Sequence, residues 1–548
     1  MRDSLPLISL QVMSLVALIT SLFSGIEFPV VFPDSAERIL ACLKYSQTAP
    51  LQLPSMFMLC FLLCFLPLLA LVSRSTGLRK LLIAAASVWL YYKLSGSWVW
   101  LLLLLAVLTW GIALAVQRRL DHGRGTSGWV AVAVGMNLLL LLLFKAGGAF
   151  GPYLGEVAGQ NWMRLAIPAG ISFFCFQSIS YVVDCRRGRI RARSSFLDVL
   201  LLLAYFPKMF LGPLVRNADF IASMQNPRLS LTREERAGAI RRIIFGLVKF
   251  CILSRVIGRF LVDPVFAAPS AAGGPASLLA VYAYTFQLYC DFSGYTDLAI
   301  GISFFLGIPL PENFALPYHS ASITEFWRRW HISLSTWLRD YLYISMGGNR
   351  KGRLRTYFNL LVTMVLGGLW HGVGVMFLLW GLWHGVLLCL HKLMLGMDNR
   401  IARYWFGKTG ASMRTLPRAV GIFVTFNAVA FGWLMFRSPD WEVFTTIAGN
   451  IASFWSASDF ESIASIAGSV SGDITSGAAL GISLVALAVA VVTHFMPSSL
   501  VAHSDRLLCR LGFWGQCLIL VLVIWAAMQT SAQLFPDATS ALPVYANF

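Results

Sequence analysis

The sequence predicts an all-α protein that crosses a membrane many times. Of its 548 residues, 57% are hydrophobic and 12% are charged, and the mean hydropathy is +0.71. Both the composition and the hydropathy lie outside the range of soluble globular chains. Apolar runs of the roughly 20 residues that a membrane-spanning helix needs recur from end to end. We therefore expect roughly eleven or twelve transmembrane helices, with re-entrant and amphipathic pieces between them.

The net charge of +18 comes from short basic loops between the apolar runs. That placement is typical of cytoplasmic loops in membrane proteins, and the chain has no DNA- or RNA-binding motif. We therefore expect these basic loops to contact membrane lipids and not to bind nucleic acid. The ten cysteines include no CxxC pair, and several lie in apolar runs, where cysteine behaves as a small hydrophobe. We predict neither a disulfide framework nor a metal site.

Residues 1–53 are interpreted as an additional N-terminal span or anchor, which precedes a single membrane domain over residues 54–548. The apolar run in this segment extends from about Leu5 to Phe32 and follows Arg2. A cleaved signal peptide is the alternative, but the run is long and lacks a clear small-residue cleavage site.

The basic loops orient the apolar runs of the first half. These runs cover residues 56–72, 81–92, 98–116, 129–144 and 167–183, with a short SGS turn between the second and the third. Five arginines between positions 186 and 193 place the loop after the fifth run in the cytoplasm. Residues 146–160 contain one acid and no base and are expected to form an external loop.

Residues 196–215 are apolar but have basic segments on both sides, which predicts a re-entrant element. Pro207, Gly212 and Pro213 interrupt any helix there. Irregular backbone at membrane depth is stable only where protein or a cavity surrounds it.

The later runs cover residues 243–261, 278–306, 357–395, 419–436, 478–495 and 513–528. Residues 309–355 are basic and are placed in the cytoplasm. We expect residues 357–395 to form two helices joined near Gly372 and Gly374. The basic residues 400–418 should form a loop, and residues 438–475, with five acids and no base, should lie outside.

The first candidate site is residues 326–337, FWRRWHISLSTW, in which two arginines and a histidine lie among three tryptophans. Ser322 and Glu325 have the spacing of a capping box, which predicts a helix start. Glu325 and Arg329 are spaced for an i,i+4 ion pair.

One amphipathic helix over this segment would carry an aromatic face with a cationic strip beside it. Its candidate positioning residues are Trp327, Trp330, Arg328, Ser335 and Arg339. His331 lies at the margin, and we favour a functional role for it, because lipid binding alone does not require a histidine there. Arg328 and Arg339 can contact lipid phosphates or a substrate, and both alternatives stay open.

The second candidate is His371, in the segment LGGLWHG. It follows Gly367 and Gly368 in a stretch without charged residues, so we expect it at membrane depth, where ionisable groups are rare and functional by default. A neutral imidazole can take a proton from a hydroxyl and return it to a leaving thiol. The alternative is a histidine hydrogen-bonded between helices. Trp370 is a further positioning candidate.

His384 lies in a second WHG, thirteen residues after His371. If one helix joined the two, thirteen steps of 100° would leave the side chains about 220° apart. We therefore predict a structural or supporting role for His384.

Asp291 and Asp297 lie in the segment YCDFSGYTDLAIG, with Ser293 and Gly294 between them. The Ser-Gly pair can unwind a helix and expose carbonyl groups. An ion site, a contact with a substrate hydroxyl, and carboxylates that orient a histidine are all compatible with the pattern. The alternative is that one or both aspartates pair with nearby arginines.

Several absences narrow the function. The GKT at residues 407–409 lacks the first glycine of a phosphate-binding loop, and no GxSxG occurs. No histidine has an aspartate five residues later. ATP-driven transport and serine-hydrolase chemistry therefore lose support. The rival to an enzyme that works through His371 is a transporter or flippase of an acylated lipid or glycan that uses the aspartates as an ion site. An inactive scaffold is a third class.

The segments FWRRWHISLSTWLRDYLYISMGG and GGLWHG resemble the membrane-bound O-acyltransferase family. They are most similar to its bacterial branch, typified by the membrane subunit of alginate O-acetyltransferase. YCDFSGYTDLAIG, PENF at residues 311–314 and residues 167–184 look like further family segments. The similarity extends from about residue 57 to the C-terminus, whereas the preceding residues depart from the usual start of the family.

The resemblance implies a ring of tilted helices around a funnel, with the acyl donor arriving from the cytoplasm and the acceptor from outside. It matches His371 to the catalytic histidine of the family and His331 to the second motif histidine. It implies no bound cofactor and acetyl transfer from a thioester such as acetyl-CoA. The implied acceptor is a hydroxyl of an exopolysaccharide, or a periplasmic acetyltransferase partner of a secretion complex at the bacterial inner membrane. Related members modify peptidoglycan or load D-alanine onto teichoic acids, so these acceptors stay open.

Overall fold

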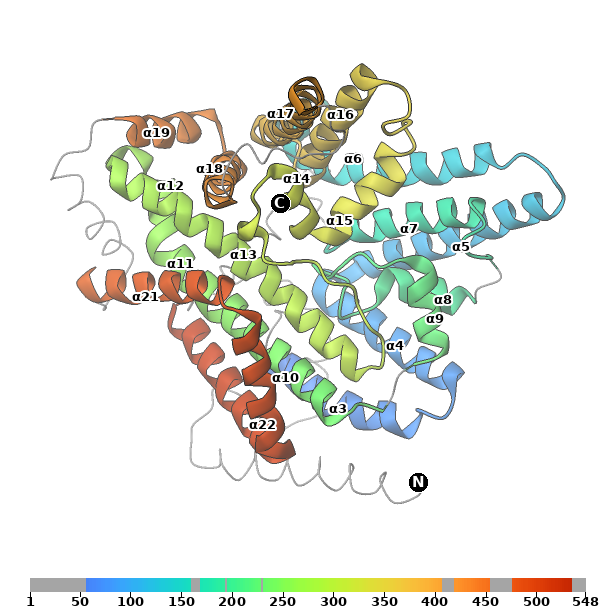
Figure 1. Cartoon of the computed structure of the whole chain (residues 1–548). Helices are drawn as coiled ribbons and strands as arrows, with labels where there is room; N and C mark the ends of the chain where they lie inside the picture. Colours follow the sequence, from blue (N-terminus) through green and yellow to red (C-terminus); the bar gives the residue numbers. More distant parts are fainter. Residues whose placement is uncertain are drawn as a thin grey trace.

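The computed structural model describes residues 56–158, 168–192, 195–227, 230–406, 418–453 and 476–534. These residues form helices and their connections, with no β-strand among them (Figure 1). The predicted all-α membrane fold is confirmed. One hydrophobic cluster contains residues from Met58 to Ala527. The expected N-terminal anchor, residues 1–53, lies outside the described residues.

Five helical stretches in the described part of the chain are long and apolar enough to cross a bilayer, and a bent pair near the C-terminus brings the number to six. They are Thr76–Asp121, Ser127–Lys145, Val375–Leu395, Arg418–Arg437 and Gly477–His494, with Ser499–Gly512 and Trp514–Gln529 as the bent pair. The roughly eleven or twelve expected from hydropathy refer to the whole chain; the first expected span lies outside the described residues, and several described apolar runs form short or interrupted helices. The ring around a funnel stays a prediction.

The N-terminal part consists of five helices in the described residues. They are α3 (Met56–Leu71), α4 (Thr76–Ser95), α5 (Val99–Asp121), α6 (Ser127–Ala158) and α7 (Ile171–Arg186). The predicted turn between α4 and α5 is a 3-10 turn over Gly96–Trp98. The external loop expected from residue 146 does not begin there, because α6 continues to Ala158.

Helices α8 (Phe196–Ala204) and α9 (Asn217–Gln225) are separated by irregular backbone, as the prolines and glycine predict. Almost every residue of this irregular segment is buried, so protein surrounds it, as required at membrane depth. Lys208 Nζ donates a hydrogen bond to the carbonyl of Leu202 at 2.6 Å, which satisfies the buried ammonium locally.

The central helix α13 (Gly274–Phe305) runs without interruption through the middle of the molecule (Figure 1). The break expected between the two aspartates is therefore wrong. Gly294 instead allows close packing against α10 (Arg233–Leu247), because a Cβ on Gly294 would lie 2.9 Å from the carbonyl oxygen of Gly246. Small residues at this position serve helix contact.

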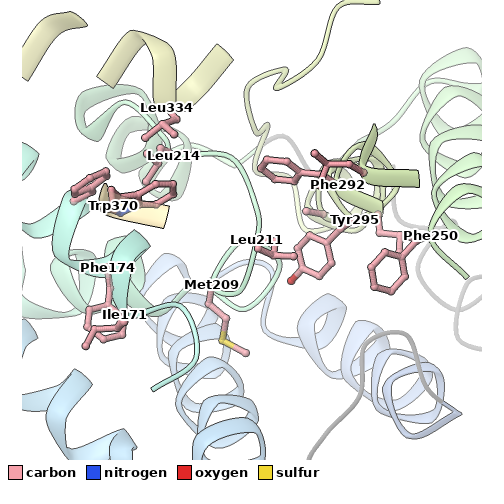
Figure 2. Close-up of a cluster of buried hydrophobic side chains, with 14 of the residues drawn as sticks. Ile171, Phe174, Met209, Leu211, Leu214, Phe250, Phe292, Tyr295, Leu334 and Trp370 are labelled. Carbon is pink, nitrogen blue, oxygen red and sulfur yellow. The ribbon is translucent and has the colours of Figure 1, made fainter. Parts of the chain in front are cut away.

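The irregular segment lies between α13 and the candidate site. Figure 2 shows Met209, Leu211 and Leu214 of this segment between Trp370 on one side and Tyr295 of α13 on the other. All five side chains are buried. The segment thus forms part of the packed interior.

The remaining helices complete the described part of the fold, and some of them pack against α13. They are α11 (Ser254–Ile257), α12 (Asp263–Ala267), α14 (Ile323–Arg329), α15 (Ile332–Trp337), α16 (Arg353–His371), α17 (Val375–Phe406), α18 (Arg418–Arg437), α19 (Trp441–Ala452), α21 (Ser476–His494) and α22 (Ser498–Leu534). Helices α16 and α17 pack along each other and are joined at an extended Gly372, which confirms the predicted pair. The loop expected from residue 400 is wrong for residues 400–406, because α17 continues to Phe406, and residues 407–417 lie outside the described residues. The external segment begins with α19 instead of a loop.

Candidate active site

Helix α14 begins as the sequence predicts but ends earlier. Ser322 Oγ accepts the N–H of Glu325 at 3.2 Å, and Glu325 pairs with Arg329 at 2.9 Å, so the helix start and the ion pair are confirmed. The expected single amphipathic helix is wrong. The backbone of His331 is left-handed, with φ 43° and ψ 53°, which separates α14 from α15 and is unusual for a residue other than glycine.

The side chain of His331 is 1% exposed and is held by Asn313. Asn313 Oδ1 accepts the N–H of Ser333 at 3.2 Å and its hydroxyl at 2.9 Å. Because a backbone N–H can only donate, Oδ1 is an acceptor, and His331 Nδ1, 3.1 Å away, must carry a proton. In the neutral ring the lone pair is therefore on Nε2. The ring packs edge-on against Phe292, with centroids 4.6 Å apart.

His371 is the last residue of α16 and is 6% exposed. Its ring contacts Trp370, Trp380 and Phe436 at centroid distances of 4.6, 5.2 and 5.1 Å. It also interacts electrostatically with His331, whose ring lies 6.5 Å from Trp370. The structure thus brings the two candidate histidines together around Trp370.

A row of rings leads from His371 toward the predicted cytoplasmic side. Trp370 stacks on Phe176 of α7, with centroids 5.3 Å apart. Phe176 stacks on Trp337 of α15 at 4.0 Å, and Trp337 contacts Tyr341 at 5.3 Å. We call these four residues the aromatic row: Trp370, Phe176, Trp337 and Tyr341.

The far end of the aromatic row meets three arginines around one carboxylate. Arg339 pairs with Asp340 at 2.7 Å, and Arg216 pairs with the same carboxylate. Arg187 donates to the backbone carbonyl of Asp340 at 3.2 Å and lies over the ring of Tyr341. We call Arg187, Arg216 and Arg339 the arginine cluster. It retains positive charge, because one carboxylate faces three guanidinium groups.

Asp340 responds to this surrounding charge. Partial burial works to raise its pKa, but the hydrogen bond from Arg339 and the charges of Arg216 and Arg339 outweigh burial. The pKa of Asp340 therefore lies below its ordinary value. Arg339 is exposed and belongs to this cluster, not to the cationic strip predicted on a single helix.

The other candidates of the first motif separate from His331. Arg328 is exposed, and its charge acts on His391 of α17. Ser335 Oγ donates to the backbone carbonyl of Trp330 at 3.3 Å. The left-handed turn thus places the predicted cationic residues on different surfaces.

His384 is fully buried in a box of aromatic side chains. Trp327, Trp380 and Trp433 surround it at centroid distances of 5.2, 4.9 and 6.2 Å. Neither ring nitrogen has a hydrogen-bond partner among the described residues. Because Trp380 also contacts His371, His384 supports one wall of the site from behind.

The two aspartates face the neighbouring helical segment 233–262. Asp297 pairs with Lys249 and, at 3.2 Å, with Arg242, so pairing with basic residues is confirmed for this aspartate. Asp291 is buried and accepts the hydroxyl of Ser254 at 3.5 Å. The unwound helix that an ion site was expected to use is absent at this position.

A sequence model described as MBOAT, membrane-bound O-acyltransferase family, matches residues 86–436, which include both candidate histidines. The chain belongs to the membrane-bound O-acyltransferase family. It is therefore a multi-pass membrane enzyme that transfers acyl groups, and the predicted family and enzyme class are confirmed.

Relatives of this membrane-bound O-acyltransferase carry different names. The probable alginate O-acetylase AlgI of Pseudomonas putida is 35% identical over 415 residues, which are 73% of this chain and 81% of that protein. The peptidoglycan O-acetyltransferase of Helicobacter pylori is 30% identical over 417 residues, 70% of this chain and 76% of that protein. The teichoic acid D-alanyltransferase of Bacillus subtilis is 31% identical over 288 residues, 49% of this chain and 68% of that protein.

Three features of the acyltransferase site were not predicted from sequence. Asn313 orients His331, and the only sequence pattern that could have predicted it is a polar residue in PENF, shortly before the first motif. Lys145 of α6 donates to two carbonyls at the end of α16; in the sequence it marks only the end of an apolar run. The three arginines of the cluster come from three separate segments of the chain, so no local sequence pattern predicts it.

Proposed function

We propose that this membrane-bound O-acyltransferase moves an acetyl group from a cytoplasmic thioester, acetyl-CoA, to a hydroxyl outside the inner membrane of a bacterium. The acceptor that we favour is an alginate-like exopolysaccharide, reached directly or through a periplasmic acetyltransferase partner of a secretion complex. The alginate relative supports this choice, because it matches the largest share of the chain among the three relatives above.

The observation that carries the proposal is the place of His371 at the end of α16. The helix begins at Arg353, beside a basic loop, and has 19 residues. At 1.5 Å per residue, His371 lies about 27 Å along the helix from that loop. With the loop in the cytoplasm, the ring would lie toward the outer side of a hydrocarbon layer roughly 30 Å thick. An external hydroxyl would approach from that side and would have to displace part of the packing around the ring to reach it.

His371 would act as the general base. Its neutral imidazole takes the proton of the acceptor hydroxyl while the hydroxyl oxygen attacks the thioester carbonyl. The tetrahedral intermediate breaks its carbon–sulfur bond, and the leaving thiolate receives the proton from the imidazolium. The products are an ester on the acceptor and a free thiol, and the imidazole returns to its starting form.

His331 would position a substrate. With the Nδ1 proton directed to Asn313, the neutral ring has an acceptor at Nε2. An acceptor can hold a hydroxyl, whereas an oxyanion requires donors. Orientation of the acceptor hydroxyl or of the donor therefore fits this tautomer better than stabilisation of an oxyanion.

The arginine cluster and the aromatic row suggest a route for the donor. Guanidinium groups bind phosphates well, and acetyl-CoA has phosphates at one end and the thioester at the other. The aromatic row connects the cluster to Trp370, next to His371. Since His371 is 6% exposed, the thioester must displace part of this packing to reach the ring. Exposed Arg328 remains a candidate for lipid or donor phosphates.

The test is acetyl transfer by purified protein in detergent, with labelled acetyl-CoA and a soluble alginate oligosaccharide. We expect His371→Gln to lower the rate by about 10²-fold or more, with unchanged folding. His503→Gln, at an exposed position on α22, is the matched control and should retain the rate. A fully active His371→Gln enzyme would overturn the proposal. Transport would need two compartments, so turnover in detergent separates an enzyme from a flippase.

The acceptor needs its own measurement. Mass spectrometry of secreted and wall polymers, with and without the gene, should show acetyl groups lost from an exopolysaccharide. Loss from peptidoglycan, or loss of D-alanine from teichoic acid, would replace the alginate assignment and leave the chemistry at His371 as proposed.

A further inference from the structure

Lys145 of α6 meets the end of α16. Its Nζ donates to the backbone carbonyl of Trp370 and, at 3.1 Å, to that of His371. The ammonium also lies over the ring of Trp370, 5.4 Å from its centroid. The apolar part of α6 has 19 residues up to Lys145, and α16 has 19 residues up to His371. Both helices begin after basic segments, so with these segments in the cytoplasm the two residues would lie at a similar depth.

A lysine at this depth requires a physical reason. The last carbonyls of a helix have no partners inside the helix, and they form the negative end of its dipole. Here α16 ends abruptly, because Gly372 is extended, with φ −168° and ψ 155°. Lys145 therefore holds the two peptide groups from which the Trp370 and His371 side chains extend.

The charge of Lys145 also acts on the His371 ring. A nearby positive charge disfavours the imidazolium form. His331 is the other titratable group that acts on this ring, whereas Trp380 of α17 and Phe436 of α18 are uncharged. Burial of the ring is the larger cause, and the charge of Lys145 acts in the same direction, toward the neutral imidazole that accepts a proton.

We propose that Lys145 is a positioning residue of the acyl-transfer site. It anchors the end of α16, so that the His371 ring keeps its place against Trp380 and Phe436. This inference rests on the proposed role of His371 as the general base. It also explains why this position has a lysine, which offers both hydrogen-bond donors and a positive charge, and not a neutral polar residue, which could also satisfy the carbonyls.

The test compares pH–rate profiles of acetyl transfer by the purified full-length enzyme. Lys145→Met removes both the donors and the charge, so we expect kcat to fall by up to about 10²-fold through misplacement of His371. The acid limb of the profile should move to higher pH, because the imidazole protonates more readily without the cation. Lys145→Arg keeps the donors and the charge, so its acid limb should match that of the wild type. Lys145→Gln keeps a donor but loses the charge, so it should keep part of kcat while its acid limb moves to higher pH.

Lys208→Met is the matched control. It removes another buried lysine that donates to a backbone carbonyl and lies over an aromatic ring, that of Phe220. We expect Lys208→Met to give less folded protein, but the acid limb of its pH–rate profile should stay where it is in the wild type. A folded Lys145→Met enzyme with the kcat and acid limb of the wild type would refute the inference. An active His371→Gln enzyme would instead refute His371 as the general base. If Lys145→Met still moved the acid limb of the pH–rate profile in that case, the lysine would act on a titrating group other than His371.

Discussion

Asn313 Oδ1 lies 3.1 Å from His331 Nδ1 and thereby selects the tautomer of the buried histidine. The same side chain accepts two hydrogen bonds from Ser333, and its backbone carbonyl accepts the N–H of Ile332 at 3.0 Å. One residue thus stabilises the left-handed turn that separates α14 from α15 and also orients the ring at that turn.

Asn313→Ala should lower both stability and rate. The substitution leaves the buried donors of Ser333 and His331 without their acceptor, at a cost of about 1–3 kcal/mol, and frees the ring to change tautomer. We expect a lower melting temperature in detergent and a lower kcat. Asn313→Asp keeps the acceptor oxygens and should recover most of the stability. An Asn313→Ala enzyme with the melting temperature and kcat of the wild type would show that this hydrogen bonding is dispensable.

Arg339→Gln should weaken binding of the donor. The arginine cluster would lose one of three guanidinium groups, so we expect KM for acetyl-CoA to rise about tenfold, as for one charge-assisted hydrogen bond, with kcat nearly unchanged. Arg437→Gln is the control, because Arg437 pairs with Asp263 in another part of the molecule. Initial rates at varied donor concentration measure the effect. Equal KM values for the two variants would remove the cluster from the donor site.

Asp340 should make stability depend on acid pH. Its folded-state pKa is depressed, so its contribution is fully present above the ordinary aspartate value of about 4 and is lost as the pH falls through the lower folded value. The difference in melting temperature between wild type and Asp340→Asn should therefore be large at pH 7 and disappear in acid. A difference that stays constant from pH 7 to 3 would mean that the carboxylate charge contributes nothing.

His384→Phe should fold and remain active. Phenylalanine fills the aromatic box and removes two buried nitrogens that lack partners among the described residues, so we expect equal or slightly higher stability. His384→Ala leaves a cavity and should cost about 2–5 kcal/mol. Melting temperature and kcat distinguish the two variants. A loss of more than about 10²-fold in kcat for a stable His384→Phe enzyme would instead assign the imidazole a direct part in proton transfer.

Local patterns accounted for much of the helical structure. The cap at Ser322, the ion pair of Glu325 with Arg329 and the joint at Gly372 follow from spacings of a few residues. Two local predictions were wrong because long-range packing decided them. Gly294 makes room for a neighbouring helix instead of breaking its own. Asn313 accepts hydrogen bonds from Ile332 and Ser333 beside the left-handed His331, a turn that helical periodicity does not foresee.

The amino-acid sequence by itself determined the membrane class, the all-α fold and the two motif histidines, because hydropathy and short motifs are local properties of the chain. The tertiary structure decided which groups surround those histidines. Lys145 reaches His371 from a helix more than two hundred positions earlier, and three separate segments supply the arginine cluster. Contacts between distant segments depend on how helices pack, and helix packing is a property of the whole folded chain.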